Sequence, residues 1–170
     1  MASKVTLRGT LSSVMLENKP TYRYAVSAFA AVATPTDVVV IQGSATKRVV
    51  IKMIKLVGAA TAAGNMPVTV IRRSTAGTIG SAVLTAIVPA KLDTNQPAAT
   101  GVVSTVGTAN YTTVGTAAGL IETGRVQMTA LGTGLDVVPF EVSSANRFSK
   151  PIILRGTLEF CCINLNGAAI

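Results

Sequence analysis

A chain of 170 residues is long enough to form one domain with a substantial core. Its composition, with 49% apolar and 13% charged residues, excludes an intrinsically disordered protein. The formal net charge of +8, from 15 Lys and Arg against 7 Asp and Glu, favours acidic or polyanionic partners. The basic residues are spread along the chain without a long run, so the sequence disfavours direct binding to nucleic acid.

The apolar content consists mostly of Val, Ile, Ala and Leu, and Thr is abundant, whereas aromatic residues make up 4% and Trp is absent. Because β-branched side chains fit pleated, half-buried surfaces, this composition predicts an all-β protein. Residues 1–15 lack the continuous apolar segment of a signal peptide. No apolar run reaches the roughly 18 residues of a membrane span, so we expect synthesis in a cytoplasm and no contact with a membrane.

Residues 1–21 are predicted to form an extended N-terminal arm, and residues 22–170 the β-domain. The arm is polar and basic with interspersed apolar residues, and Pro20 ends it. A terminal segment of this kind becomes ordered only when a neighbour or a partner holds it. We therefore expect partner contacts from its basic and apolar side chains, which are Lys4, Leu7, Arg8, Leu11, Val14, Leu16 and Lys19.

The β-domain begins with alternating or continuous apolar segments that end at Gly, Pro or Thr. The pattern predicts strands at 22–33, 37–42, 46–57, 66–73 and 79–88. The continuous apolar segment 37–42 indicates burial on both faces. Segment 46–57 is a long predicted strand, with odd-numbered residues from Lys47 to Val57 on one face and even-numbered residues on the other.

The second half of the chain is richer in small residues. Residues 89–97 are a polar connector whose first part, 89–93, is the best of several weak helix candidates. Residues 98–119 are of low complexity and could be two small strands or an ordered loop. Later strands are predicted at 125–130 and 136–142, followed by a loop and a closing hairpin. In that hairpin, 151–155 and 158–165 would pair around a turn at 156–157.

About eight short strands joined by Gly, Pro and Thr turns suggest a β-sandwich or barrel. A jelly roll with two sheets of about four strands fits this number, and the sequence leaves the connectivity open.

The residues do not form a recognisable catalytic pattern. The chain has no His, which removes the commonest general base and the commonest metal ligand. Gly132 and Gly134 lack the third glycine of a dinucleotide loop. The sequence therefore predicts no catalytic residue, no cofactor and no metal, and a protein that is not an enzyme. We expect the seven carboxylates to be separate surface charges, namely Glu17, Asp37, Asp93, Glu122, Asp136, Glu141 and Glu159.

Cys161 and Cys162 are adjacent in the last predicted strand. Neighbouring side chains on a strand point to opposite faces, so a disulfide between them would need unusual geometry. We interpret them as packing residues, one buried and one on the other face.

The densest positive charge occurs at Lys47-Arg48, Lys52, Lys55 and Arg72-Arg73. Two interpretations remain open. The charges could keep an apolar β-protein soluble and guard strand edges. They could instead form salt bridges to an acidic partner surface, where they would serve orientation and association rate.

Three stretches resemble the head decoration (cement) proteins of tailed bacteriophages. They are 25–74 (AVSAFAAVATPTDVVVIQGSATKRVVIKMIKLVGAATAAGNMPVTVIRRS), 102–121 (VVSTVGTANYTTVGTAAGLI) and 151–167 (PIILRGTLEFCCINLNG). The resemblance implies a β-sandwich that binds outside the capsid as a homotrimer near local threefold positions. It implies the major capsid protein as partner, a place on the outer capsid surface of the virion, and synthesis in the host cytoplasm.

A structural cement protein would use the arm and the basic clusters as its capsid and subunit interface. An alternative is a receptor- or carbohydrate-binding module on a phage tail or fibre. Such sites usually present aromatic platforms, which would be thin in a chain with three Tyr, four Phe and no Trp. Besides the arm residues named above, the candidate interface residues are Lys47, Arg48, Arg72, Arg73 and Arg147.

Overall fold

The computed structural model of the protein describes residues 20–26, 36–57, 59–60, 64–79, 84–106, 111–130, 139–143 and 150–165. Within these ranges every regular element is a β-strand, and the pairings are antiparallel except for one. The all-β prediction is therefore confirmed. The predicted arm lies outside the described residues except for its last two, and Arg147 lies outside them as well.

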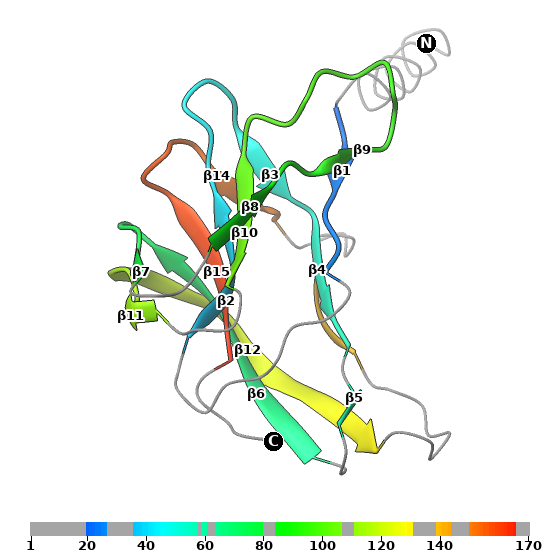
Figure 1. Cartoon of the computed structure of the whole chain (residues 1–170), viewed down its shortest axis with the longest axis vertical. Helices are drawn as coiled ribbons and strands as arrows, with labels where there is room; N and C mark the ends of the chain where they lie inside the picture. The colour runs from blue at the N-terminus through cyan, green and yellow to red at the C-terminus, as the bar shows by residue number, and fades with distance from the viewer. Residues whose placement is uncertain are drawn as a thin grey trace, which may run out of the picture.

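Fifteen strands, β1 to β15, follow one another along the described residues (Figure 1). Their number exceeds the roughly eight predicted, because several segments that look continuous in the sequence are broken into shorter strands. In chain order they are β1 (Tyr22–Arg23), β2 (Asp37–Gln42), β3 (Val49–Ile51), β4 (Met53–Leu56), β5 (Ala59–Ala60), β6 (Gly64–Arg73), β7 (Thr78–Ile79), β8 (Leu84–Ile87), β9 (Ala90–Lys91), β10 (Val102–Val106), β11 (Tyr111–Thr113), β12 (Ala117–Ala130), β13 (Phe140–Ser143), β14 (Ile152–Leu154) and β15 (Phe160–Asn164).

The main sheet has seven strands in the order β5-β12-β6-β15-β2-β10-β8. Strand β15 lies at its centre and pairs antiparallel with both β6 and β2. All five residues of β15 are buried. A strand that is covered on both faces is expected to be mostly apolar, which explains why the segment Phe160–Ile163 shows no polar alternation.

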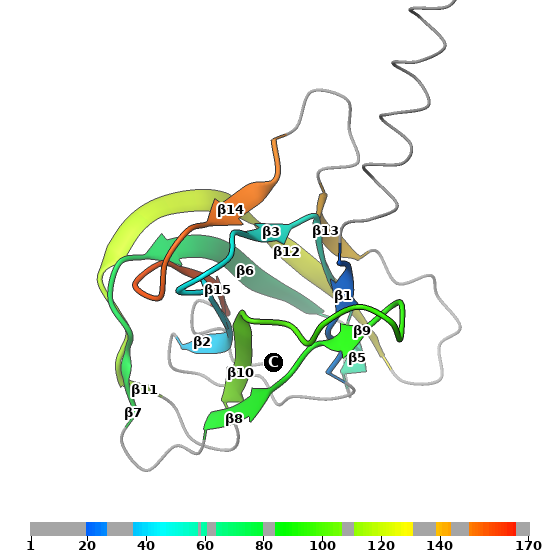
Figure 2. The same cartoon turned by 90° about the horizontal axis from the view of Figure 1, so that it is seen from above.

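Strands β3, β4, β13 and β14 form a second layer over one face of the main sheet (Figure 2). In this layer β3 pairs with β14 and β4 pairs with β13. The apolar core lies between the two layers. Its buried members are Val38, Val39, Met66, Val68, Val70, Val103, Val126, Cys161, Ile163 and Leu165 from the main sheet and adjoining residues, and Ile54, Leu56, Phe140 and Leu154 from the second layer.

The strands predicted at 37–42 and 66–73 are confirmed, the first with the same bounds and the second as part of β6. The long strand predicted at 46–57 is wrong in one respect, because the chain breaks at Lys52 between β3 and β4. Val49 and Ile51 pack against the core before the break, and Ile54 and Leu56 are buried after it. The inward side therefore changes from odd to even numbers, as each half pairs with a different partner strand.

The closing hairpin is also wrong, although its two strands lie where they were predicted. A turn is present, since the Glu159 N–H donates to the Gly156 carbonyl at 3.1 Å. However, β14 pairs with β3 in the second layer, whereas β15 enters the main sheet. Residues 155–159 thus carry the chain from one layer to the other instead of joining two partners.

Six other predicted segments can be compared with the structure. The helix candidate at 89–93 is wrong, because β9 pairs there with β1. Residues 24–26 are not in a strand, so within the described part the predicted strand 22–33 is only β1.

The segment 98–119 contains β10, β11 and the start of β12, and the predicted strand 125–130 is the end of the 14-residue β12. The strand predicted at 79–88 is divided between β7 and β8, and that at 136–142 is β13 where the structure describes it.

Candidate functional site

A buried polar cluster lies on the face of the main sheet that points away from the apolar core. Arg73 Nε and Nη2 donate to the two carboxylate oxygens of Asp37 at 2.6 and 2.8 Å. Asn164 Nδ2 donates to Asp37 Oδ1 at 2.8 Å, and Arg73 Nη1 donates to the Gly115 carbonyl at 2.7 Å. The carboxylate of Asp37 is only 2% exposed, so the prediction that it is a surface charge is wrong.

Burial and the charges of the ion pair together shift the pKa of Arg73 and of the neighbouring Tyr111 and Cys162. Burial opposes the charge on Arg73, but the hydrogen bond and the charge of Asp37 outweigh it and raise the pKa of the guanidinium. Burial, together with the charge of Asp37, raises the pKa of Tyr111 to about 12. It also raises the pKa of Cys162, and burial alone raises the pKa of Cys161 to about 12.

Both thiols are therefore protonated at neutral pH, and a protonated thiol is neither a nucleophile nor a metal ligand. They are free cysteines with exposed fractions of 0% and 1%, and the interpretation as packing residues is confirmed. The detail that only one of them is buried is wrong, because both faces of β15 are covered. Groups of three or more His, Cys, Asp or Glu that could hold a metal ion do not occur among the described residues. None of the described elements is a helix long and apolar enough to cross a membrane.

Arg73 thus uses its guanidinium inside the protein, with 6% of the residue exposed. A buried, bidentate pair of this kind fixes the geometry of the strands that carry it, here β2 and β6. Because Arg73 is buried, it does not belong to the predicted partner surface, and its role is structural.

The remaining basic residues of segment 47–57 do face solvent. We define the outer strip as Lys47, Arg48, Val50, Lys52, Met53, Lys55 and Val57, all of which are exposed. Its apolar members have exposed fractions of 46% for Val50, 55% for Met53 and 63% for Val57. The outer strip therefore places apolar side chains among cations, along strands β3 and β4.

These two strands also have an open edge. In the described part of the chain, β3 pairs only with β14 and β4 only with β13. An edge strand offers unpaired backbone groups, and lysines there discourage uncontrolled pairing with other strands. The outer strip can thus serve both predicted roles. It can prevent uncontrolled strand pairing at this edge, and it can form a basic contact surface.

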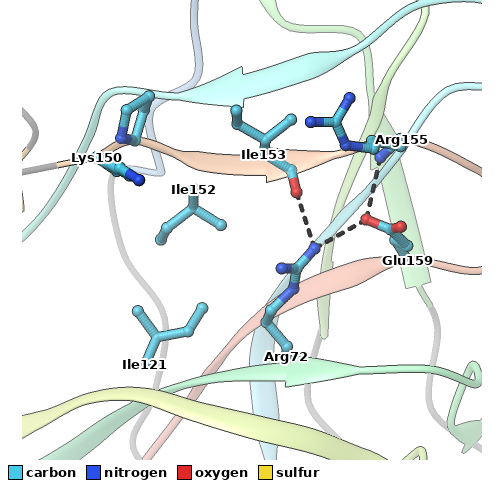
Figure 3. A pocket seen from close by; sticks show the side chains of 8 residues that line it. Arg72, Ile121, Lys150, Ile152, Ile153, Arg155 and Glu159 are labelled. Atoms are coloured by element: carbon cyan, nitrogen blue, oxygen red, sulfur yellow. Dashed lines mark hydrogen bonds and ion pairs between the residues drawn. The ribbon is translucent and has the colours of Figure 1, made fainter.

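A hollow of about 350 Å³ lies between the two layers at the other arginine of the predicted pair (Figure 3). Arg72 Nη2 donates to the Ile153 carbonyl and to Glu159 Oε2, each at 2.8 Å. Glu159 Oε2 also accepts the backbone N–H of Arg155 at 3.1 Å. The pair is partly open to water, with side-chain exposures of 40% for Arg72 and 39% for Glu159. The lining is Arg72, Ile121, Lys150, Pro151, Ile152, Ile153, Arg155 and Glu159.

The candidate residues are thus divided among three places. Lys47 and Arg48 lie on the outer strip, Arg72 lines the hollow, and Arg73 is buried. The structure does not bring them together into one surface. The arm candidates Lys4, Leu7, Arg8, Leu11, Val14, Leu16 and Lys19, together with Arg147, lie outside the described residues.

The aromatic side chains that the structure describes are turned largely inward. Tyr111, Phe140 and Phe160 are buried, with exposures of 8%, 8% and 5%. Tyr22 is partly buried and its hydroxyl donates to the Pro97 carbonyl at 2.9 Å. Tyr24 packs against the apolar core. Within the described ranges, the aromatic residues do not gather into a surface platform.

Sequence reasoning missed the polar cluster and the hollow. A signal for the cluster existed, because Asp37 directly precedes the apolar run 38–41 and Asn164 directly follows the apolar run 160–163. A polar residue at the end of a buried strand needs a partner, and pairing β2 with β15 places Asp37 opposite Asn164. The hollow had no such signal, since its lining comes from strands that are distant in the sequence.

Comparison of the chain with protein-family models, with curated protein sequences and with solved structures finds no match. The function must therefore be inferred from the surfaces of the molecule itself.

Proposed function

We propose that the protein is a non-enzymatic structural component of a phage virion, a decoration (cement) protein on the outer capsid surface. It binds the major capsid protein as a homotrimer and stabilises contacts between neighbouring capsid subunits. The outer strip is the observation that carries this proposal. It lies within the first stretch that resembles decoration proteins, residues 25–74.

The outer strip has the composition of a protein contact surface. Apolar side chains at the centre of an interface supply burial, and charged residues around them supply orientation and faster association. Val50, Met53 and Val57 would take the first role. Lys47, Arg48, Lys52 and Lys55 would take the second toward an acidic capsid surface, which agrees with the net charge of +8.

The buried ionisable groups support a structural role over a catalytic one. The carboxylate of Asp37 is bound by Arg73 and Asn164, and the guanidinium of Arg73 is bound by Asp37 and Gly115. The thiols of Cys161 and Cys162 are held in their protonated form by burial. These groups stabilise the fold, because the charged groups bind one another and the thiols are buried.

The jelly-roll form of the sandwich belongs to the same proposal. The chain goes from β2 in the main sheet to β3 and β4 in the second layer, and returns to the main sheet with β5 and β6. It makes the same passage again from β12 through β13 and β14 to β15. Repeated crossing between two antiparallel layers supports a sandwich of this type.

Trimer formation would make weak single contacts sufficient. Each copy presents its own outer strip, so attachment of one copy raises the effective concentration of the others at the capsid. The predicted arm, residues 1–21, would add contacts to neighbouring subunits.

The proposal is tested by the occupancy of purified capsids. Lys47→Glu with Arg48→Glu reverses two charges of the outer strip, and we expect occupancy at limiting protein concentration to fall about tenfold or more. The matched control is Arg23→Glu with Lys91→Glu, which reverses two exposed charges on the β1–β9 pair. Quantitative gel analysis of sedimented capsids measures both variants. Equal occupancy of the outer-strip variant and the control would contradict the proposal.

The alternative function, a receptor- or carbohydrate-binding module on a tail or fibre, has less support. The described aromatic side chains are buried or partly buried and do not form a platform for sugar rings. Micromolar binding on a glycan array would revive this alternative.

A further inference from the structure

The hollow beside Arg72 has the features of a binding site that is separate from the outer strip. Arg72 comes from the end of β6, and Ile152 and Ile153 come from β14 in the other layer. Figure 3 shows Arg72, Ile121 and Ile152 facing the hollow, with Lys150 at one end and Glu159 at the other. The site is therefore built between the two layers and depends on the complete fold.

Hydrogen bonds hold the Arg72 guanidinium in place and use only some of its N–H donors. Its Nη2 makes both of its bonds, to the Ile153 carbonyl and to Glu159. Within the described part of the chain, Nη1 and Nε make no hydrogen bond, and a guanidinium has N–H donors on each of these atoms. A cation that is fixed from one side can bind an anion from the other with little further loss of side-chain freedom.

The charge of the lining is unbalanced. Three cations, Arg72, Lys150 and Arg155, stand against the single carboxylate of Glu159. Glu159 is paired with Arg72. Among the described residues the side chains of Lys150 and Arg155 have no hydrogen-bond or ion-pair partner. In Figure 3 the guanidinium of Arg155 lies beyond β14, so Lys150 is the unpaired cation nearest to the hollow.

The rest of the lining is apolar. Ile121, Ile152 and Pro151 provide a hydrocarbon wall next to the charged groups. A ligand that suits this site has an anionic end and an apolar stem, as the side chain of a glutamate has. We propose that the hollow binds a glutamate-type carboxylate on an acidic segment of a partner protein. The carboxylate contacts Arg72 and Lys150, and the methylene groups pack against Ile121 and Ile152.

A protein carboxylate fits better than a nucleic acid. Nucleic-acid sites track an extended backbone with many cations, whereas this hollow is about 350 Å³ and combines the cations Arg72 and Lys150 with the apolar wall of Ile121 and Ile152. The inference does not depend on the virion role, because the site would bind an acidic segment in any assembly.

The test uses the full chain and two labelled, blocked peptides. In the first, glutamates alternate with alanine and isoleucine, and in the second, glutamines replace the glutamates. Fluorescence anisotropy of the label measures binding, and ¹⁵N-resolved amide shifts of the protein locate it. We expect the acidic peptide to bind more tightly than the glutamine peptide and to shift the amides of Arg72, Ile121 and Ile152.

Lys150→Glu is the variant to compare, because Lys150 is exposed and its replacement should leave the fold intact. We expect affinity for the acidic peptide to fall about tenfold, and the control Lys91→Glu to leave it within about twofold. Circular dichroism confirms that both variants are folded. Equal affinities of both variants, or amide shifts away from the hollow, would overturn the inference. Tighter competition by a single-stranded oligonucleotide or by inorganic phosphate at the same amides would overturn the choice of a protein carboxylate.

Discussion

Arg72 and Arg73 are adjacent in the sequence, yet they lie on opposite faces of β6 and have opposite roles. Arg72 shares a face with Val70, lines the hollow and has a side chain that is 40% exposed. Arg73 is buried on the other face, in a bidentate pair with Asp37. The face of the strand, and not the residue type, thus decides whether an arginine is buried in an ion pair or remains open to water.

The two ion pairs differ in energy for the same reason. A buried pair that loses one partner leaves an uncompensated charge in a medium of low polarity, whereas a pair that is open to water leaves a charge that water can solvate. Variants on the two faces should therefore give very different losses of stability, and the following predictions go from the largest to the smallest.

Asp37→Ala should lower the free energy of unfolding by about 3–5 kcal/mol, because Arg73 would remain charged and buried without its partner. Chemical denaturation followed by circular dichroism measures this loss. Asp37→Ala combined with Arg73→Met should recover part of it, since the uncompensated charge is removed. A loss below about 1 kcal/mol for the single variant would mean that the pair does not hold the sheet together.

Gly115→Ala should cost about 1–3 kcal/mol. A Cβ at Gly115 would overlap the Thr75 carbonyl oxygen and push away the backbone carbonyl that accepts from Arg73. Gly119→Ala in β12 is the matched control, because a Cβ there meets nothing within 4 Å. Thermal unfolding of the two variants should differ clearly. Similar melting temperatures would show that the close approach at Gly115 is unimportant.

Stability should fall as the pH rises above about 9. The unfolded Cys161 thiol has a pKa near 9.0, and burial raises its pKa to about 12 in the folded protein. Between these values the unfolded state binds fewer protons than the folded state, so each pH unit removes up to about 1.4 kcal/mol for this thiol. Tyr111, with a folded pKa of about 12, adds to the loss above about pH 10.

Denaturation curves recorded from pH 7 to 11 measure that slope. Cys161→Ala should have lower stability at neutral pH and a shallower alkaline slope, because one of the titrating groups is gone. An unchanged slope would indicate that the Cys161 thiol is accessible to hydroxide in the folded protein.

Glu159→Gln should cost only about 0.2–1 kcal/mol, because the pair with Arg72 is about 40% exposed and water screens it. The same replacement removes the only carboxylate among the described residues that line the hollow, so affinity for the acidic peptide should rise. Fluorescence anisotropy of the labelled peptide measures the affinity, and chemical denaturation of the same sample measures the stability. A stability loss as large as that of Asp37→Ala would remove the distinction between the two arginines.

Composition and periodicity were sufficient for the fold class and for several strands. The continuous apolar segment 37–42 predicts a strand with buried faces, and β2 occupies the same residues between β15 and β10. The pairing of strands could not be predicted, because it depends on contacts between distant segments. Residues 151–165 therefore looked like a hairpin, although their strands belong to different layers.

The candidate site was predicted only in part. The dense positive charge in segment 46–57 indicated basic residues on the surface, and Lys47 and Arg48 are exposed. The same reasoning could not predict that Arg73 is buried and Arg72 is partly exposed, because burial depends on which elements cover each face of β6. The hollow forms where β6, β12 and β14 come together in space, and the local sequence of each strand does not predict this contact.

A cryo-electron microscopy reconstruction of phage particles that, under the proposed function, carry this protein tests that function most directly. We predict density for the β-domain on the outer capsid surface where several major capsid subunits meet, with residues 47–57 against an acidic region of the capsid protein. Density for the protein on the tail or fibres, or on the capsid with residues 47–57 turned away from it, would contradict the account.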